Sequence, residues 1–379
     1  MVPSGTYFEN VVMSDGIAVE GAGEDETFLV GTVTFTGITD GSLSRMTLVD
    51  DSWFSTGTEH VWDGVLVTGA SDVTLSELGL WHFHWGIVAE ASSVVTVDRS
   101  TFVRNWYGIV AEDAQLDVAS SLFQGNGVGG VALGLDAHRP VYGNDFVGNS
   151  FDASSAYLTG AIAVGPSTTP STVVDNLVIS NFYGVDCSSC DATFTTNLVW
   201  GNGTDYVNDA SQGFDALNQD PMLADPVEGD FHLTAASPCV DAGTGGYYSL
   251  DFEGESRPLG GGFDIGMDEY TTSSLDLLIT EVIANASTES TGELVEIYNA
   301  GGAPVDLAGL WVSDGDDTDE LVAFQGSATT LAAGAYAVVL DPDYAGDYTI
   351  DAAVVKLTTD DSTIGNGLTT SEGVVVYES

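Results

Sequence analysis

Two histidines lie one residue apart between two tryptophans in the stretch WHFHWGIVAE, residues 81–90. Imidazole nitrogens at this spacing could bind a metal ion or transfer protons. In an extended segment side chains alternate between faces, so His82 and His84 would share one face and the aromatic rings the other. Because the spacing supplies no third ligand, exposed side chains covering a turn are favoured over a metal site. The intermediate hypothesis is a sugar-stacking patch formed by Trp81, His82, His84, Trp85 and Trp106.

The cysteines in DCSSCD, Cys187 and Cys190, could be a redox pair, half of a zinc site or a local disulfide. A zinc site needs two further ligands, and the sequence has no second CxxC and no HxxxH motif. We therefore favour a Cys187–Cys190 disulfide in an exported, extracellular or cell-surface protein, with Cys239 as a small buried hydrophobic residue.

The stretch SDGDDTDE, residues 313–320, concentrates oxygen ligands as a calcium loop would. It lacks the ligand spacing and the distal glutamate of an EF-hand, so a solvated acidic loop is the alternative. Calcium is the only cofactor that the sequence suggests. Its ligands would be Asp314, Asp316, Asp317 and Asp319.

Acidic residues dominate the composition of the 379-residue chain. The 57 Asp and Glu oppose 6 Lys and Arg, which gives a formal net charge of −51 spread along the whole sequence. Such a surface repels nucleic acid and anionic membranes, so neither is an expected partner. No run of 18 apolar residues is present, so direct membrane insertion is not expected. The 46 glycines and the short runs of Val, Thr and aromatic residues predict an all-β protein.

The elements that position these residues repeat with a period near 22. Glycines that open the segments GVLV, GIVA, GIVA and GVAL are spaced by 22, and weaker echoes follow in GAIA from Gly160 and GVDC from Gly184. In step with them, an apolar residue is followed three positions later by asparagine. These asparagines are Asn105, Asn126, Asn149, Asn181 and Asn202.

A coil of about 22 residues cannot bury its apolar face alone, so successive coils must stack. Stacked asparagines at one turn can pass hydrogen bonds from coil to coil. The pattern therefore predicts a right-handed parallel β-helix with an asparagine ladder. Counting from the repeated glycine places the WHFHW stretch beside a turn near the start of the ladder, with Phe83 where later coils have Asn.

Residues 1–270 resemble the pectin-lyase-like superfamily of bacterial β-helix proteins. The opening SGTYFENVVMSDGIAVEGAGEDETFLVG is similar to the first coils of that group, and DPMLADPVEGDFHLTAASPCVDAG, DFEGESRP and FDIGMDEY are similar to its C-terminal closing segment. The resemblance implies a structural charge cluster of Asp241, Asp251 and Arg257. It also implies a first strand and capping helix before the first residue, so we expect a fragment of a larger polypeptide.

After a linker at residues 271–274 the period disappears and ordinary alternating strands begin. Residues 275–379 resemble a bacterial lamin-tail domain, an immunoglobulin-like β-sandwich, through LLITEVIANA, GELVEIYNAGGAPVDLAGLWVSD and LAAGAYAVVLDPD. The family has further strands, so we expect this sandwich to be incomplete. The residues that carry the match are Glu281, Glu293, Glu296, Tyr298, Asn299, Leu307, Gly309 and Trp311.

The pectin-lyase-like superfamily contains lyases and hydrolases, so the resemblance raises the question of catalysis. The only lysine, Lys356, lies outside the β-helix, and no Gly-His-Gly motif is present. Asp50 with Asp51 is assigned to a solvated turn, and Asp98 with Arg99 to an exposed strand edge. We therefore assign no catalytic residue, although several acids clustered with an arginine in one groove would favour an enzyme.

We expect a non-catalytic structural or adhesive segment of a large exported protein, with polysaccharide or calcium as ligands. A polysaccharide lyase or glycoside hydrolase is one alternative. The other is a subunit of a head-to-tail extracellular filament, because unpaired strand edges associate. The expected partners are accordingly other segments of a larger polypeptide, neighbouring subunits or polysaccharide.

Overall fold

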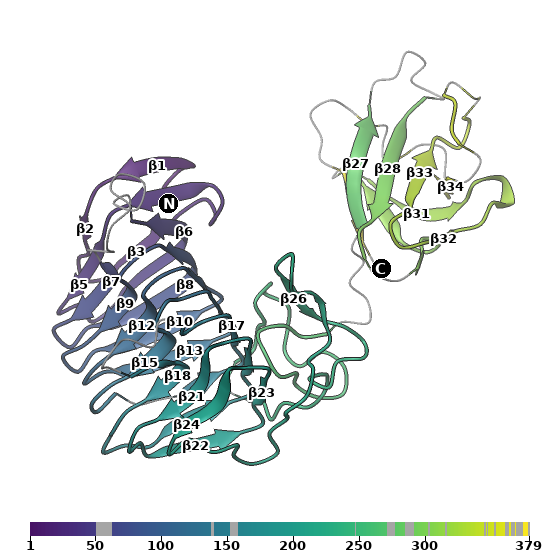
Figure 1. Ribbon diagram of the computed structural model, residues 1–379. Helices are drawn as coiled ribbons and strands as arrows, with labels where there is room; N and C mark the ends of the chain where they lie inside the picture. The colour runs from purple at the N-terminus through teal and green to yellow at the C-terminus, as the bar shows by residue number, and fades with distance from the viewer. Residues whose placement is uncertain are drawn as a thin grey trace. The chain divides into compact units, whose positions relative to one another are not determined.

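The computed structural model describes residues 1–50, 63–137, 140–151, 158–246, 248–270, 277–284, 292–301, 304–314, 317–344, 346, 348–351, 354–360, 364, 368 and 374–377. The chain divides into two compact units, Met1–Thr271 and Thr272–Ser379, each with its own apolar core (Figure 1). Among the described residues the only helix is a 3-10 turn, η1 (Phe324–Gly326), so the predicted all-β class is confirmed. No helix in these ranges is long and apolar enough to cross a membrane.

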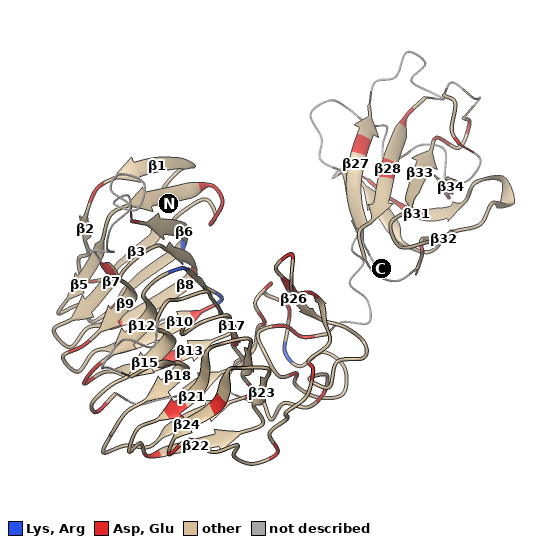
Figure 2. Cartoon of the chain, viewed as in Figure 1, with Lys and Arg blue, Asp and Glu red and all other residues tan. Residues whose placement is uncertain are grey.

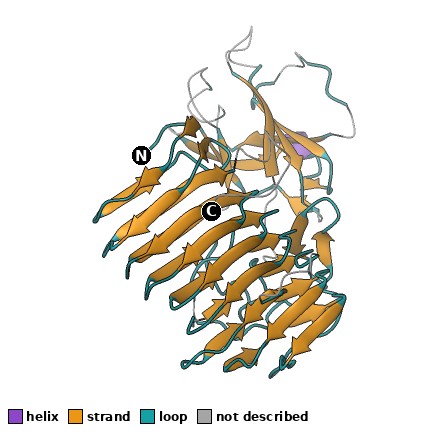
Figure 3. Cartoon of the chain, turned by 60° about the vertical axis from the view of Figure 1, so that its left-hand side comes forward, coloured by secondary structure: helices purple, strands orange, loops and turns teal. Residues whose placement is uncertain are grey.

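The first unit is a solenoid of stacked parallel strands, as predicted (Figure 3). One parallel sheet consists of β2 (Val11–Val12), β5 (Val33–Thr36), β7 (Asp63–Thr68), β9 (Trp85–Ala89), β12 (Tyr107–Ala111), β15 (Gly129–Leu133), β18 (Gly160–Val164), β21 (Tyr183–Cys187) and β24 (Thr204–Asn208).

A second parallel sheet forms the remaining sides of the coils. Its strands are β1 (Gly5–Phe8), β3 (Ile17–Glu20), β4 (Thr27–Val30), β6 (Gly41–Val49), β8 (Asp72–Trp81), β10 (Val94–Asp98), β11 (Thr101–Val103), β13 (Gln115–Ala119), β14 (Leu122–Gln124), β16 (Pro140–Tyr142), β17 (Asp145–Val147), β19 (Ser171–Val174), β20 (Leu177–Ile179), β22 (Ala192–Thr195) and β23 (Leu198–Trp200).

Each coil turns at corners where one or two residues adopt the left-handed backbone conformation. In the coil that contains β10 and β11, the first corner has Ala91 and Ser92, with φ of 56° and 61°, and the others have Arg99 and Arg104, with φ of 43° and 55°. A small polar residue follows each corner, and its side-chain oxygen accepts the amide of the residue stacked on it in the preceding coil. The three acceptors are Ser93, Ser100 and Asn105, at distances of 3.2, 3.1 and 2.9 Å. Polar ladders therefore satisfy buried corner amides that the strands leave unpaired.

The repeated glycines allow close approach between coils. A Cβ atom at Gly108 would lie 2.6 Å from the carbonyl oxygen of Gly130 and 2.7 Å from the ring of Phe123. Later in the chain the repeated glycine is displaced by one residue relative to the strand pairing. Gly160 pairs with Gly129 and not with Gly130. The predicted echo at Gly160 is therefore wrong by one position.

The solenoid core is a column of apolar side chains that continues from coil to coil. The rings of Phe102, Phe123 and Phe146 stack with centroids 4.5 and 4.7 Å apart, and all three are fully buried. This stacking continues the strand spacing of about 4.8 Å through the interior. Removal of one ring would break contacts with both neighbouring coils.

After the last coil the chain folds back along one corner as a closing segment, residues 218–270. It begins with an antiparallel hairpin of β25 (Leu223–Asp225) and β26 (Asp230–Leu233). Ser120 in the solenoid donates to the carbonyl of Leu250 at 2.8 Å, and the amide of Met267 donates to Asp145 Oδ1 at 2.9 Å. The closing segment thus covers the side of earlier coils (Figure 1).

The second unit is a mainly antiparallel β domain consistent with the predicted immunoglobulin-like sandwich. The pair of β33 and β34 is parallel. Asn299 is buried and donates to the carbonyl of Leu331 at 3.2 Å. The strands are β27 (Leu277–Ile283), β28 (Leu294–Asn299), β29 (Val305–Asp306), β30 (Trp311–Ser313), β31 (Thr318–Ala323), β32 (Thr330–Leu331), β33 (Tyr336–Leu340), β34 (Val355–Thr359) and β35 (Val375–Tyr377).

Candidate functional site

The WHFHW stretch is not one extended segment. β8 ends at Trp81, β9 begins at Trp85, and His82 between them has the left-handed φ of 66°. Phe83 is buried in the core, and its amide donates to Asn105 Oδ1 at 2.9 Å. Phe83 therefore occupies the first position of the asparagine ladder, as predicted. The expectation that the two histidines share one face of an extended segment is wrong, because the chain turns a corner at His82.

Four ring side chains from two successive coils gather on the outer face of the nine-stranded sheet. His84 stacks on Trp85 with ring centroids 4.6 Å apart, and the His84 centroid lies 6.4 Å from that of Trp106. Tyr107 pairs in register with Trp85, and its hydroxyl donates to the carbonyl of Leu158 at 3.1 Å. We call this site the aromatic groove. Its volume is about 320 Å³ and its lining is His84, Trp85, Val88, Ala89, Glu90, Trp106, Tyr107, Val110 and Glu112.

The aromatic groove has ring side chains at one end and its two lining carboxylates, Glu90 and Glu112, at the other. The run from His84 to Glu90 spans about 20 Å at about 3.3 Å per residue. At its acidic end, Glu90 accepts a hydrogen bond from Thr68 Oγ1 at 3.1 Å. Burial, followed by the charge of Glu90, raises the pKa of Asp63, which pairs opposite Trp85. Ring faces beside carboxylates suit a ligand that has both apolar faces and hydroxyl or amino donors.

The structure brings together three of the five residues expected in the sugar-stacking patch, namely His84, Trp85 and Trp106. Trp81 lies in the other sheet, where it pairs with Val49 and Val103, and neither Trp81 nor His82 lines the groove. Sequence reasoning missed Tyr107, Glu90 and Glu112. The repeat contained the signal, since Tyr107 and Glu112 stand 22 residues after Trp85 and Glu90.

Opposite charges alternate along one corner of the solenoid. Arg45 lies 3.2 Å from Glu20 and 3.6 Å from Glu77, and Arg99 lies 3.1 Å from Glu77 and 2.9 Å from Asp98. Acids and arginines therefore do cluster, but they lie outside the aromatic groove. We call this row of side chains the charged ridge. Each arginine bridges two carboxylates. Ion pairing along this corner therefore explains why these residues cluster.

Two carboxyl groups of the first unit are withdrawn from solvent. Asp50 is buried, so its assignment to a solvated turn is wrong, and Asp51 lies outside the described residues. Glu24 reaches Thr101 with a hydrogen bond of 3.3 Å, and burial raises its pKa to about 7. A carboxyl that can exchange a proton near neutral pH is the feature of this ridge that a hydrolase would need.

The predicted asparagine ladder is confirmed. Each side-chain amide donates to the oxygen of the next asparagine, at 3.1, 2.8, 3.0 and 2.9 Å along the row. A parallel row that sequence reasoning missed occupies another corner. It runs through Ser100, Ser121, Asn144, Asn176 and Asn197.

The charge cluster expected in the closing segment has different members from those predicted. Arg257 pairs with Glu269 at 2.8 Å, with both side chains fully buried. Asp251 instead accepts the amide of Glu255 at 2.7 Å. Asp241 does not pair with Arg257, because it accepts the amides of Gly261 and Gly262. These contacts hold loops in place, which agrees with a structural role.

The expected calcium loop is the turn of a hairpin between β30 and β31, in which Ser313 pairs with Thr318. Asp314 and Asp319 are only 3% and 5% exposed, so a solvated loop is wrong for these two. Asp314 Oδ1 accepts the amide of Asp317 at 2.9 Å, as a turn requires. Asp316 lies outside the described residues. Calcium at this turn stays a prediction.

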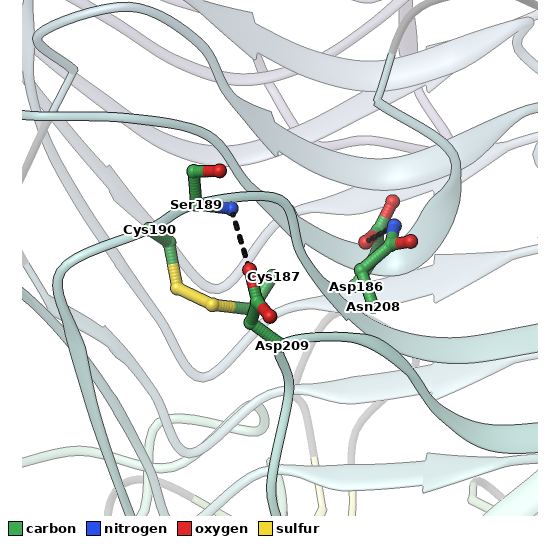
Figure 4. Close-up of a disulfide and its surroundings, with 6 residues drawn as sticks. All are labelled: Asp186, Cys187, Ser189, Cys190, Asn208 and Asp209. Carbon is green, nitrogen blue, oxygen red and sulfur yellow. Dashed lines mark hydrogen bonds between the residues drawn. A yellow bond between two sulfur atoms is a disulfide. The ribbon is translucent and has the colours of Figure 1, made fainter.

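Cys187, the last residue of β21, forms a disulfide with Cys190 (Figure 4). The amide of Ser189 between them donates to Asp209 Oδ2 at 3.2 Å, which ties the turn to the next coil. Cys239 is free and buried, and burial raises its pKa to about 12. Cys239 therefore lacks the thiolate character of a reactive cysteine.

Asp and Glu residues are distributed over both units, whereas Lys and Arg residues are few (Figure 2). Comparison with known proteins identifies two regions. Residues 63–220 match the family model described as a right handed beta helix region, and residues 271–376 match the Lamin Tail Domain. No curated protein matches the chain. The chain therefore joins a right-handed β-helix to a lamin tail-type domain.

Proposed function

We propose that this protein is a non-catalytic structural or adhesive component of an extracellular assembly and binds polysaccharide in the aromatic groove. The observation that carries the proposal is the convergence of Trp85, Trp106 and Tyr107 beside Glu90 and Glu112 on one sheet face. Parallel strands hold these rings in a fixed register, so the site requires little ordering when a ligand binds. The Cys187–Cys190 disulfide supports export, since such bonds persist in oxidising compartments.

The charge of the protein favours neutral or amino-sugar chains over uronic acid chains. Glu90 and Glu112 line the groove, and the whole chain carries a net charge of −51. Uronate carboxylates would be repelled both by these two glutamates and by the net charge of the chain, whereas hydroxyl and ammonium groups can donate hydrogen bonds to the glutamates. We therefore expect binding to a neutral glucan or to chitosan oligosaccharides, and not to polygalacturonate.

Isothermal titration of the full chain with these three polysaccharides tests the proposal. Trp85→Ala and Trp106→Ala should each weaken binding about tenfold or more, which corresponds to about 1.4 kcal/mol, because each substitution removes a ring face. Phe214→Ala is the matched control, since Phe214 is 79% exposed and does not line the groove. Unchanged affinity in both tryptophan variants would refute the site.

The same samples distinguish binding from catalysis. After long incubation the polysaccharides should keep their length, and no new reducing ends or unsaturated products should form. Cleavage by wild-type protein that is lost in Glu24→Gln would instead assign a hydrolase to the charged ridge and overturn the non-catalytic role.

A further inference from the structure

Three metal-binding side chains converge in the closing segment from stretches that lie far apart in its sequence. His232 is in β26, Glu253 lies in a loop whose next residue, Gly254, is close to Arg99, and Asp268 precedes the end of the first unit. The ligand atoms of these residues all lie within 4.8 Å of one another. His232 Nε2 is 3.1 Å from Glu253 Oε1. No other group of this kind occurs in the ranges that the structure describes.

Neighbouring groups hold these side chains in place. The second ring nitrogen of His232, Nδ1, lies 2.6 Å from Asp230 Oδ1. A carboxylate on the far nitrogen is the arrangement that orients a metal-binding imidazole. Asp268 is buried, and its Oδ2 accepts the amide of Leu233 at 2.7 Å, so its carboxylate is fixed beside β26.

We propose that His232, Glu253 and Asp268 bind a divalent transition-metal ion, with Zn²⁺ as the preferred ion. A ligand set of one imidazole and two carboxylates suits Zn²⁺, whereas Ca²⁺ takes oxygen ligands. Three protein ligands leave a coordination position for water. The site is independent of the aromatic groove, so either can exist without the other.

Such an ion would act as a cross-link in the fold. It would tie the β25–β26 hairpin to two loops, and these segments share no regular sheet with one another. Without a metal, the contacts of His232 with Glu253 and Asp230 hold the same segments together. The metal site and this ion-pair cluster make different predictions for added metal. A metal that binds only the folded protein raises its stability, whereas an ion-pair cluster does not respond.

Titration calorimetry and thermal melts of chelator-treated full-length protein test the site with ZnCl2, and with CaCl2 as the comparison. One equivalent of Zn²⁺ should bind and raise the melting temperature of the first unit. His232→Ala and Glu253→Gln should each weaken this binding about 100-fold or more. Asp230→Asn, which alters only the orienting carboxylate, should weaken it about 10- to 100-fold. Glu228→Gln is the matched control, because Glu228 is an exposed acid on the same hairpin and outside the cluster.

A folding defect is separated from a ligand defect by circular dichroism of each variant and by Co²⁺ spectra. Co²⁺ should give visible absorption bands well above the weak absorption of hydrated Co²⁺ in wild-type protein and in Glu228→Gln, and only the weak absorption in a folded Glu253→Gln variant. Absence of stoichiometric Zn²⁺ binding in wild-type protein would overturn the proposal. Zn²⁺ binding that persists in the folded His232→Ala and Glu253→Gln variants would also overturn it, since the ion would then lie elsewhere on the acidic surface.

Discussion

At the scale of single residues, the solenoid depends on side chains that satisfy buried corner amides. Asn126 is fully buried, and its side chain makes four hydrogen bonds. Its oxygen accepts from the backbone and side-chain amides of Asn105 at 3.0 and 3.1 Å. Its own side-chain amide donates to Asn149 Oδ1 at 2.8 Å and to the carbonyl of Phe102 at 3.0 Å. Asn126 therefore links three successive coils through one side chain.

The change Asn126→Ala should lower the free energy of unfolding of the first unit by about 1–3 kcal/mol, because the amide of Asn105 would stay buried without an acceptor. Urea unfolding followed by circular dichroism measures the loss. Asn10→Ala is the control, since Asn10 is exposed and accepts a single backbone hydrogen bond at 2.9 Å. A cost for Asn126→Ala no larger than that of the control would contradict the role of the ladder.

At the scale of elements, buried carboxylates that accept backbone amides fix the closing segment, both against the solenoid through Asp145 and within the segment through Asp264. Asp145 in β17 accepts the amide of Met267, and Asp264 accepts the amides of Asp241 and Tyr270. Burial raises the pKa of Asp145 to about 8 and that of Asp264 to about 6. These groups favour the protonated form in the folded state, although hydrogen bonds from the amides oppose this shift.

Stability of the closing segment should therefore fall as the pH rises from about 4 to about 8. In this window the folded state binds more protons than the unfolded state, whose carboxyls titrate near 3.8, and the slope of stability with pH is negative. The total change is on the order of a few kcal/mol, at about 1.4 kcal/mol per pKa unit. Hydrogen exchange of the Met267 amide at pH 5.5 and 8, corrected for intrinsic rates, measures it. Asp145→Asn, which keeps an acceptor oxygen and cannot ionise, should flatten the dependence; an equal slope in this variant would contradict the assignment.

The period of 22 made most of the solenoid predictable, and the limits of prediction lie where the period fails. Spacing placed Phe83 at the ladder position, because a corner repeats at a fixed distance from the glycine. It missed the second ladder, where Ser121 gives way to Asn144 and hides the repeat. After the insertion before Gly160, the glycine stands one residue away from its expected partner. Counting residues could not reveal this displacement.

The aromatic groove and the His232 cluster also differ in whether the sequence could predict them. The aromatic groove lies within the period, so Trp85 was found and Tyr107 could have been. His232, Glu253 and Asp268 lie in a segment without a period, where backbone packing alone decides which residues meet. Sequence spacing therefore carries no signal for this cluster. For residues 313–320 the solvated loop is wrong for Asp314 and Asp319. Spacing could not decide on calcium, which stays a prediction, because a hairpin turn and a calcium loop use the same residues, Asp and Gly.

At the scale of the whole molecule, repulsion among carboxylates is not balanced by basic residues. The net charge is −51, and the ion pairs of the charged ridge, which are exposed or half-buried, involve only two basic residues, Arg45 and Arg99. Exposed pairs contribute about 0–1 kcal/mol each. Their loss in salt is therefore small beside the relief of repulsion among 57 carboxylates.

Salt should consequently stabilise the protein. Raising NaCl from 10 mM to 1 M shortens the Debye length from about 30 Å to about 3 Å, and each kcal/mol gained should raise the melting temperature by about 2–4 °C. Most of the gain should come below about 0.3 M, where the Debye length already falls under about 8 Å, whereas an effect of salt on water structure would grow steadily to 1 M. Millimolar CaCl2 should exceed NaCl at equal ionic strength, because a divalent ion neutralises neighbouring carboxylates more strongly. Differential scanning calorimetry with chelator, CaCl2 and graded NaCl measures these effects, and melting temperatures that stay constant across the series would show that repulsion does not limit stability.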